Sequence, residues 1–149
     1  MVPLLMKSKP PHPASKKEAV FRAAKSVFIR SGFAGASMDE IARTAGATKA
    51  TVYAHAKSKE ELFRFTVREA VKLAAAKIWA PDQAVPKDQA LDRFLARFVE
   101  ISCWQGAVSL QRTVIAAQAE FPDTAELIYT EVFVPARTVL SNYLAGIGV

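Results

Sequence analysis

The sequence predicts an all-α fold, and three observations support that prediction. Apolar residues recur three and four positions apart along most of the 149-residue chain, which is the period of a helix with one buried face. No stretch alternates apolar and polar residues in the way of a half-buried strand. Glycines and prolines stand between the periodic segments, where helices end, and a hydrophobic content of 51% is ample for a core.

Residues 1–14 are predicted to be a disordered basic arm. They contain four prolines and two lysines, a composition that favours disorder over packed structure. Such an arm can follow a DNA minor groove or have no role, and the sequence leaves both open. Ser15 then caps the first helix, which ends near Gly32. The apolar stripe of that helix consists of Val20, Ala23, Ala24, Val27 and Phe28.

The segment that follows has the pattern of two short helices joined by a tight turn. Ser37 and Glu40 are spaced as a capping box that opens the first helix. Gly46 ends it, because glycine takes a positive φ at no steric cost, and Thr48 is placed to cap the second helix. The core-facing residues of the first helix are Met38, Ile41, Ala42 and Ala45. This is the layout of a DNA-reading helix-turn-helix.

The second of these helices, predicted to span residues 48–56, is the recognition helix of the motif. Val52 and Ala56 lie four apart and face the core, which leaves the other side to polar residues. These outward residues are Lys49, Thr51, Tyr53 and His55. A small, cationic face that can form hydrogen bonds suits a DNA groove. Similar helix pairs occur in proteins that never bind nucleic acid, so the alternative is a helical protein-interaction module with no specific DNA target.

Positive charge is concentrated in the half of the chain that contains this motif. Residues 1–72 contain 14 Lys and Arg against 6 Asp and Glu, whereas residues 73–149 contain 6 against 8. The two halves therefore carry net charges of +8 and −2. This asymmetry is typical of a protein that meets phosphate at one end. Lysines on solvated helix faces explain part of the excess, but they explain its segregation less well.

A long helix is predicted to follow the motif. Ser58 and Glu61 form another capping box at its start, and it continues to Trp79, shortly before Pro81. Its buried side consists of Phe63, Val67, Ala70, Val71, Ala74 and Ile78. A helix of about 20 residues is about 30 Å long, so a shift at its far end would move the DNA-reading part.

The chain is therefore divided into two domains. Residues 15–62 are assigned to the helix-turn-helix DNA-binding domain, and residues 63–149 to a helical regulatory and dimerisation domain. The segment 81–87, which contains two prolines, is predicted to be the boundary between the long connecting helix and the helices that follow it.

The second domain is predicted to consist of further helices. The first reaches about Trp104, Gly106 breaks it, and a nearly all-apolar helix occupies residues 107–119. Residues 121–124 end one helix and start the next. Pro135 is assigned to the first turn of a final helix that ends at residue 146, because proline is tolerated there and harmful in mid-helix. In the helix that reaches about Trp104, the apolar stripe consists of Leu91, Phe94, Leu95, Phe98 and Val99.

Several other classes of function find no support in the sequence. No apolar run approaches the length of about 18 residues that spans a bilayer, and no secretory signal precedes the domains. The single Cys103 cannot form an internal disulfide, which fits a reducing compartment. Neither a Cys/His cluster nor a phosphate-binding glycine loop occurs, and Cys103 has no neighbouring histidine in sequence. We therefore expect a cytoplasmic protein with no catalysis, metal, cofactor or membrane partner.

The chain resembles the TetR-type transcriptional regulators in two regions. Residues 18–67 resemble their N-terminal domain, through Ala23-Ala24-Lys25-Ser26-Val27-Phe28, Gly32-Phe33, Ser37-Met38-Asp39-Glu40-Ile41-Ala42, Ala45-Gly46, Thr48-Lys49-Ala50-Thr51-Val52-Tyr53-Ala54-His55 and Ser58-Lys59-Glu60-Glu61-Leu62. Residues 107–145 are similar to one of the C-terminal domain types of that family, through Gln111-Arg112, Phe121-Pro122 and Pro135-Ala136-Arg137.

The resemblance implies a homodimeric repressor that binds a pseudo-palindromic DNA operator and releases it when a small-molecule effector binds. It implies that Lys49 and Thr51 face the major groove and that Thr48 lies close to the DNA backbone. The Ala50 methyl group and the shape of the DNA would add to sequence preference. The implied contacts to the DNA backbone are Ser37, Tyr53, His55 and Lys59.

Two departures from the family pattern bear on these expectations. Ala56 stands where relatives usually carry an aromatic residue, and we expect Phe63 or Phe65 to fill the space. Relatives also continue with another long helix where this sequence ends at Val149. We therefore expect either a shortened protein or a dimer that is built differently, with a C-terminal domain that need not enclose a pocket.

Six residues of the second domain are candidates for an effector pocket, although aromatic residues at helical spacing are more often core. They are Phe98, Trp104, Arg112, Gln118, Phe121 and Phe133. Arg112 stands on a nearly apolar helix, so it needs a carboxylate partner, a ligand anion or solvent. We expect internal pairing, for which the available partners are Glu100, Glu120 and Glu126.

Overall fold

The computed structural model describes residues 15–78 and 89–146, and every regular element in these ranges is helical. The first range contains α1 (Lys16–Gly35), α2 (Met38–Ala45), α3 (Lys49–Tyr53) and α4 (Lys59–Ile78). The second contains α5 (Ala90–Cys103), α6 (Gln105–Ala116), α7 (Pro122–Ile128), the π-helical segment η2 (Tyr129–Phe133) and α8 (Val134–Gly146). The all-α prediction is confirmed. The predicted arm at 1–14, Trp79 and the boundary at 81–87 lie outside the described residues.

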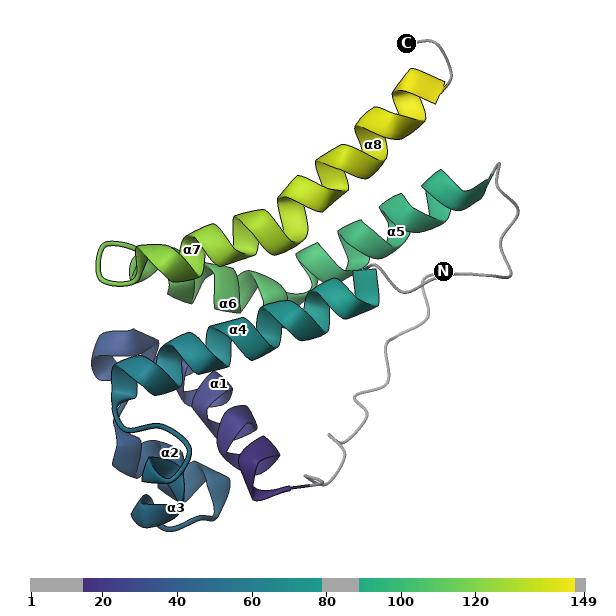
Figure 1. The fold of residues 1–149 in the computed structure, drawn as a ribbon. Helices are drawn as coiled ribbons and strands as arrows, with labels where there is room; N and C mark the ends of the chain where they lie inside the picture. Colours follow the sequence, from purple (N-terminus) through teal and green to yellow (C-terminus); the bar gives the residue numbers. More distant parts are fainter. Residues whose placement is uncertain (1–14, 79–88, 147–149) are drawn as a thin grey trace.

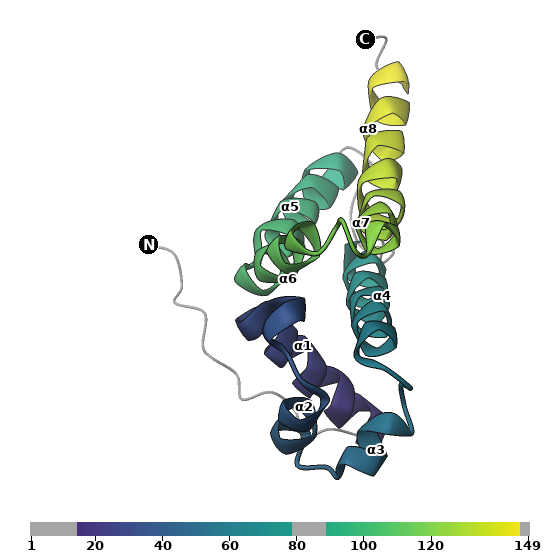
Figure 2. The same cartoon turned by 90° about the vertical axis from the view of Figure 1, so that its left-hand side faces the viewer.

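The helices form two groups, which α4 connects (Figure 1). α1, α2 and α3 gather at one end of the molecule, and α4 starts beside them and runs below α5, α6 and α7. Figure 2 shows α6 directly above the C-terminal end of α1, with α7 and α8 above α4. The turn between α2 and α3 therefore lies at the end of the molecule opposite to the C-terminal part of α8.

α1 begins and bends where the sequence indicates. The Ser15 Oγ accepts a hydrogen bond from the Glu18 N–H at 3.1 Å, which satisfies an amide that has no partner within the helix. Gly32 has φ 67° and ψ 177°, so the regular helix stops there and the last turn, to Gly35, takes another direction. Phe33, directly after this bend, is buried in the core.

Four phenylalanines, which we call the phenylalanine cluster, form the centre of the core. The ring centroids of Phe28 and Phe33 on α1 lie 5.1 and 5.3 Å from that of Phe63 on α4. The ring of Phe121, just before α7, lies 4.5 Å from Phe33 and 5.0 Å from Phe63 and is 1% exposed. Phe121 was predicted to line an effector pocket. It instead packs the C-terminal part of the chain against α1 and α4.

The two rings expected to compensate for Ala56 both have packing roles. Ala56 itself is buried. Phe63 belongs to the phenylalanine cluster, whereas Phe65 packs edge-on against Phe21, with 6.2 Å between the ring centroids. That one of them fills the space beside Ala56 stays a prediction.

The break between α5 and α6 falls at Trp104, two residues before its predicted place at Gly106. Trp104 has an extended backbone, with φ −61° and ψ 136°, and Gly106 lies inside the first turn of α6. The Trp104 ring folds back over this glycine, so that a Cβ atom at position 106 would lie 2.3 Å from the nearest ring atom. Gly106 is therefore needed to make room for the ring, and it does not break the helix.

The final helix predicted at 135–146 is confirmed as α8, which begins at Val134 and has Pro135 in its first turn. No break precedes it, however, because α7, η2 and α8 follow one another as a continuous rod (Figure 1). A proline inside a helix lacks an N–H, and its ring clashes with the carbonyl four residues earlier. Here the Val134 N–H bonds to the Tyr129 carbonyl, five residues back. This wide π-helical turn directly before the proline takes up the irregularity without ending the helix.

Part of the apolar stripe predicted in the second domain lies on the surface. On α5, Phe94 and Phe98 pack against the core, but Leu95 and Val99 are exposed. α8 has no buried residue at all. The helical period located the apolar faces correctly, but it could not show that these faces extend beyond what the chain itself covers.

Replacing Phe121 by alanine should lower the free energy of unfolding by about 3–5 kcal/mol, because it leaves a cavity beside the rings of Phe33 on α1 and Phe63 on α4. Urea unfolding followed by circular dichroism measures this loss. Phe133→Ala is the matched control, because the Phe133 ring is exposed and its removal should change stability far less. Equal losses for both variants would contradict the central role of the phenylalanine cluster.

Candidate DNA-binding surface

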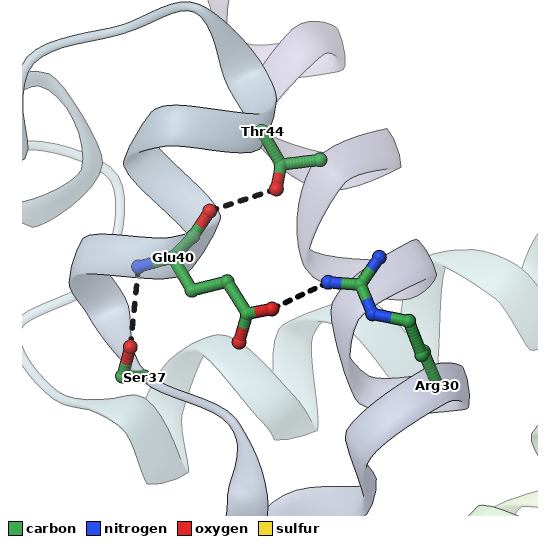
Figure 3. A network of polar contacts seen from close by, with 4 residues as sticks. All are labelled: Arg30, Ser37, Glu40 and Thr44. Atoms are coloured by element: carbon green, nitrogen blue, oxygen red, sulfur yellow. Dashed lines mark hydrogen bonds and ion pairs between the residues drawn. The ribbon is translucent and has the colours of Figure 1, made fainter.

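The start of α2 is fixed by a small polar network that also holds α2 against α1 (Figure 3). The Ser37 Oγ accepts from the Glu40 N–H at 3.1 Å, as predicted for the cap. The Glu40 carboxylate, predicted to reach back to Ser37, instead forms an ion pair with Arg30 of α1. A hydrogen bond between two charged groups is stronger than one to a neutral amide. Thr44 completes the network by donating to the Glu40 carbonyl at 2.8 Å.

The turn between α2 and α3 has the predicted chemistry. Gly46 takes the left-handed conformation, with φ 62° and ψ 32°, and the Ala47 N–H donates to the Ala42 carbonyl at 3.0 Å. The Thr48 Oγ1 accepts from the Thr51 N–H at 3.2 Å and lies 2.9 Å from the Thr51 hydroxyl. Both threonine side chains are thus held in place at the start of α3.

α3 is shorter than the recognition helix predicted at 48–56. It spans Lys49–Tyr53, and residues 54 and 55 form a turn. The His55 N–H bonds to the Val52 carbonyl, only three residues back, which tightens the end of the helix. The chain must turn here because Ser58 already caps α4, by accepting from the Glu61 N–H at 3.2 Å. The predicted capping box places the Glu61 carboxylate on the N–H of Ser58. In the structure this carboxylate accepts from the N–H of Lys57 instead.

Most of the residues predicted to contact DNA lie on the surface of this end of the molecule. The buried Val52 anchors α3, which leaves the rest of the helix open to solvent. Tyr53 is 43% exposed and Thr51 is half-buried beside Thr48. The other exposed candidates are Ser37, Thr48, Lys49, Ala50 and His55. The structure therefore brings seven of the eight residues to the segments around the α2–α3 turn.

Asp39 is a residue of this surface that the sequence analysis did not single out. Its Oδ1 lies 2.8 Å from the Lys49 Nζ, and both side chains are mostly exposed. The hydrogen bond to Asp39 and the charge of that carboxylate raise the pKa of Lys49 above its usual value. The sequence does place Asp39 in the first turn of α2, and this was the one sign that its carboxylate belongs to the surface. The ten-residue separation from Lys49 gives no hint of their contact.

Lys59 has a different environment from the phosphate contact that the resemblance implied. Its Nζ donates to the carbonyls of Phe33, Ala36 and Ala34, at 3.0, 3.2 and 3.5 Å. The ammonium group also lies 4.4 Å from the centre of the Phe33 ring. An ammonium group has three N–H donors, and here they face three carbonyls between the bend at Gly32 and the start of α2. We call this stretch, residues 33–37, the α1–α2 connection. Lys59 therefore ties the start of α4 to it.

The six effector-pocket candidates do not gather at one place. The rings of Phe98 and Phe133 meet at 6.2 Å between α5 and η2, whereas Phe121 is in the phenylalanine cluster. Trp104 and Gln118 are exposed at opposite ends of α6. Arg112 is exposed too. The prediction of an internal ion pair for Arg112 is wrong for the described residues, where none of the three glutamates pairs with it.

Within residues 15–78 and 89–146, no group of three or more His, Cys, Asp or Glu is placed to hold a metal ion. Nor does either range contain a helix with the length and apolar character to cross a membrane.

The fold and the surface around α3 define a helix-turn-helix DNA-binding protein. Residues 20–64 match the family model of the bacterial regulatory proteins of the tetR family. Residues 89–147 match the C-terminal domain of the AefR-like transcriptional repressors. The chain therefore belongs to the TetR family of transcriptional regulators.

Solved structures of similar proteins agree with this assignment. A putative TetR-family regulator from Mesorhizobium loti MAFF303099 is 26% identical, with a TM-score of 0.70, over 93% of this chain and 72% of that chain. The flavonoid-responsive regulator FrrA is 29% identical, with a TM-score of 0.68, over 88% of this chain and 67% of its own. A transcriptional regulator from Rhodococcus sp. Rha1 is 26% identical, with a TM-score of 0.67, over 90% and 72%.

Replacing Lys59 by methionine should lower the free energy of unfolding by about 1–3 kcal/mol, because part-buried carbonyls of the α1–α2 connection lose their donor. Thermal and urea unfolding measure this loss. Lys57→Met is the matched control, because Lys57 is exposed and lies only two residues earlier. If the two variants were equally stable, the contacts of the Lys59 ammonium group would not hold the connection.

Proposed function

We propose that this TetR-family regulator is a ligand-responsive repressor that binds a pseudo-palindromic operator as a homodimer, through α3. The observation that carries the proposal is the exposed face of α3, which the Gly46 turn, the Thr48 cap and the buried Val52 hold in one orientation. A rigid helix with exposed polar side chains at one end of the molecule suits insertion into a major groove.

The side chains on this face divide into two roles. Lys49 and Thr51 would read base edges, together with the methyl group of Ala50, because a lysine can donate to guanine and a methyl group can contact thymine. The contacts to phosphate would come from Ser37, Thr48, Tyr53 and His55, which fix register and add affinity without reading sequence.

The ion pair between Lys49 and Asp39 would act as a restraint on DNA binding. Lys49 can reach a base only if its ammonium group exchanges the Asp39 carboxylate for an acceptor on the DNA. The carboxylate also places a negative charge beside the incoming phosphates, which is unfavourable. Asp39 thus lowers the affinity for DNA in general, whereas Lys49 contributes to the choice of sequence.

The response to an effector would travel through the contact between α4 and α7. Arg64, in the second turn of α4, forms a 3.0 Å ion pair with Asp123 in the first turn of α7. The Arg64 guanidinium also lies 4.7 Å from the centre of the Phe121 ring. α4 starts six residues after α3 ends, so a movement of α7 against α4 would be passed to the reading helix. FrrA, a similar protein, is a flavonoid-responsive regulator, which supports small-molecule control in this chain.

The dimer would form through α8. This helix has no buried residue, yet four of its large apolar side chains are exposed by 37–38%. They are Val139, Leu140, Tyr143 and Leu144. A contiguous apolar stripe of this kind is typical of a surface that another chain covers. A second copy paired at α8 would give the twofold symmetry that a pseudo-palindromic operator requires.

Selection from a pool of random duplexes should enrich a pseudo-palindromic sequence, and fluorescence anisotropy then gives the affinity for it. Lys49→Ala should weaken binding to the enriched duplex by about tenfold or more. Lys72→Ala, an exposed lysine on α4, is the matched control and should change binding little. Asp39→Asn should tighten binding to enriched and shuffled duplexes alike. An unenriched pool would exclude sequence-specific binding, and no binding even at low salt would favour the protein-interaction module.

Replacing Leu140 and Leu144 together by glutamate should convert the dimer to a monomer, because like charges would face each other across the twofold axis. Sedimentation velocity measures the change. Asn142→Glu adds a charge to the opposite side of α8 and should leave the dimer intact. A dimer that persists in the double variant would exclude α8 as the interface.

A further inference from the structure

An open cavity of about 360 Å³ lies between α1 and α6, outside the contact between Phe98 and Phe133. It is lined by Ile29 and Gly32 of α1 and by Ser109, Arg112, Thr113 and Ala116 of α6. Figure 2 shows that these two helices meet where the DNA-binding end adjoins the C-terminal helices. We call this place the α1–α6 seam. A molecule bound there would touch both domains at once.

The lining of the cavity combines one cation with small polar and apolar groups. Arg112 is exposed, and no carboxylate among the described residues pairs with it. Thr113 is buried and its hydroxyl donates to the Ser109 carbonyl at 2.9 Å, and Ser109 itself also lines the cavity. Ile29 and Ala116 supply an apolar wall, and Gly32 adds no side chain that would narrow the space.

A second unbalanced cation lies along the same seam. Lys25 stands one turn before Ile29 on α1, and its Nζ is 6.0 Å from the centre of the Trp104 ring at the start of α6. Burial, and then the charge of Lys77, lower the pKa of Lys25 below its usual value. No carboxylate is paired with Lys25 in the described parts of the chain. The seam thus carries two cations that no carboxylate of the described residues pairs with.

We propose that the α1–α6 seam binds a small organic anion with an apolar body, of the class of the aromatic carboxylates. Its carboxylate pairs with the planar fork of the Arg112 guanidinium, which binds both oxygens of such a group. The Ser109 hydroxyl donates to the same carboxylate, and the ring lies against Ile29 and Ala116. A neutral molecule of the same shape gains only the apolar contacts and leaves Arg112 without a counter-charge.

Binding in the seam can change the position of the DNA-binding surface. This consequence rests on the proposed function. Arg30 follows Ile29 directly on α1 and forms the ion pair with Glu40 at the start of α2. A ligand between Gly32 and Arg112 widens the seam, moves α1 relative to α6, and carries α2 and α3 with α1. The anion would therefore lower the affinity for the operator.

The test is a titration of the full ¹⁵N-labelled chain with benzoate, with benzamide as the neutral isostere, followed by amide chemical shifts. Benzoate should give saturable shifts at residues 29–32 and 109–116, and benzamide should give none of comparable size. Arg112→Gln should weaken benzoate binding by about tenfold. Arg137→Gln, which removes an exposed arginine from α8, is the matched control and should bind as the unchanged chain does.

Three outcomes would overturn the proposal. They are no saturable shifts with benzoate, equal binding by the Arg112→Gln variant, and shifts centred on Phe98 and Phe133 instead of the seam. Well-dispersed amide signals of each variant show that it is folded. The titration contains no DNA, so its failure would remove the anion site alone, whereas failure of the duplex selection would remove the proposed operator binding and leave the anion site standing.

Discussion

The packing of Phe121 against α1 and α4 is the contact on which the rest of the structure depends. The helices that form the candidate DNA-binding surface are short, with eight residues in α2 and five in α3. Isolated helices of such length are marginal in water. Their position therefore comes from α1 and α4, whose crossing is fixed by Phe28, Phe33 and Phe63. Phe121 closes this cluster from the C-terminal side, so the core of the DNA-binding domain is completed by a residue from the other domain.

The cations of the chain divide into those that the protein uses for itself and those that it leaves available. Arg30, Lys59 and Arg64 are bound to groups of the protein and hold α2, the α1–α2 connection and α7 in place. The ion pair between Arg64 and Asp123 is largely exposed, so it adds little to the free energy of unfolding and serves mainly to orient α7 on α4. Because Asp123 lies outside residues 1–72, its pairing with Arg64 offsets one of the charges counted in the +8 of that half. Arg112 and Lys25, in contrast, have no carboxylate among the described residues, and this makes the α1–α6 seam a candidate site.

Local chemistry explains which features could be predicted from the sequence. The caps at Ser15, Ser37, Thr48 and Ser58 join a side chain to an amide three residues later, so sequence spacing alone determines them. The Glu40 carboxylate instead found Arg30, ten residues away, and Lys59 found carbonyls more than twenty residues away, which spacing cannot indicate. The helical period likewise predicted the apolar faces of α5 and α8, but it could not predict that these faces are exposed. For the candidate DNA site, the outward face of α3 followed from the helical period, whereas the Asp39 contact required the fold.

The helices of the DNA-binding end contact the C-terminal helices at several places, and the difference between two of these contacts bears on regulation. The contact between α4 and α7 is closely packed at Phe121 and has the Arg64–Asp123 ion pair at its surface, so these two helices pass a movement from one to the other. The seam between α1 and α6 is open, and its cavity holds no ring that must move. A small ligand can supply only a few kcal/mol of differential binding energy, and it shifts an equilibrium only by that amount. The seam is therefore the place where such a ligand can reposition α1, and the phenylalanine cluster, which joins α1 to α4, passes that movement on to α4.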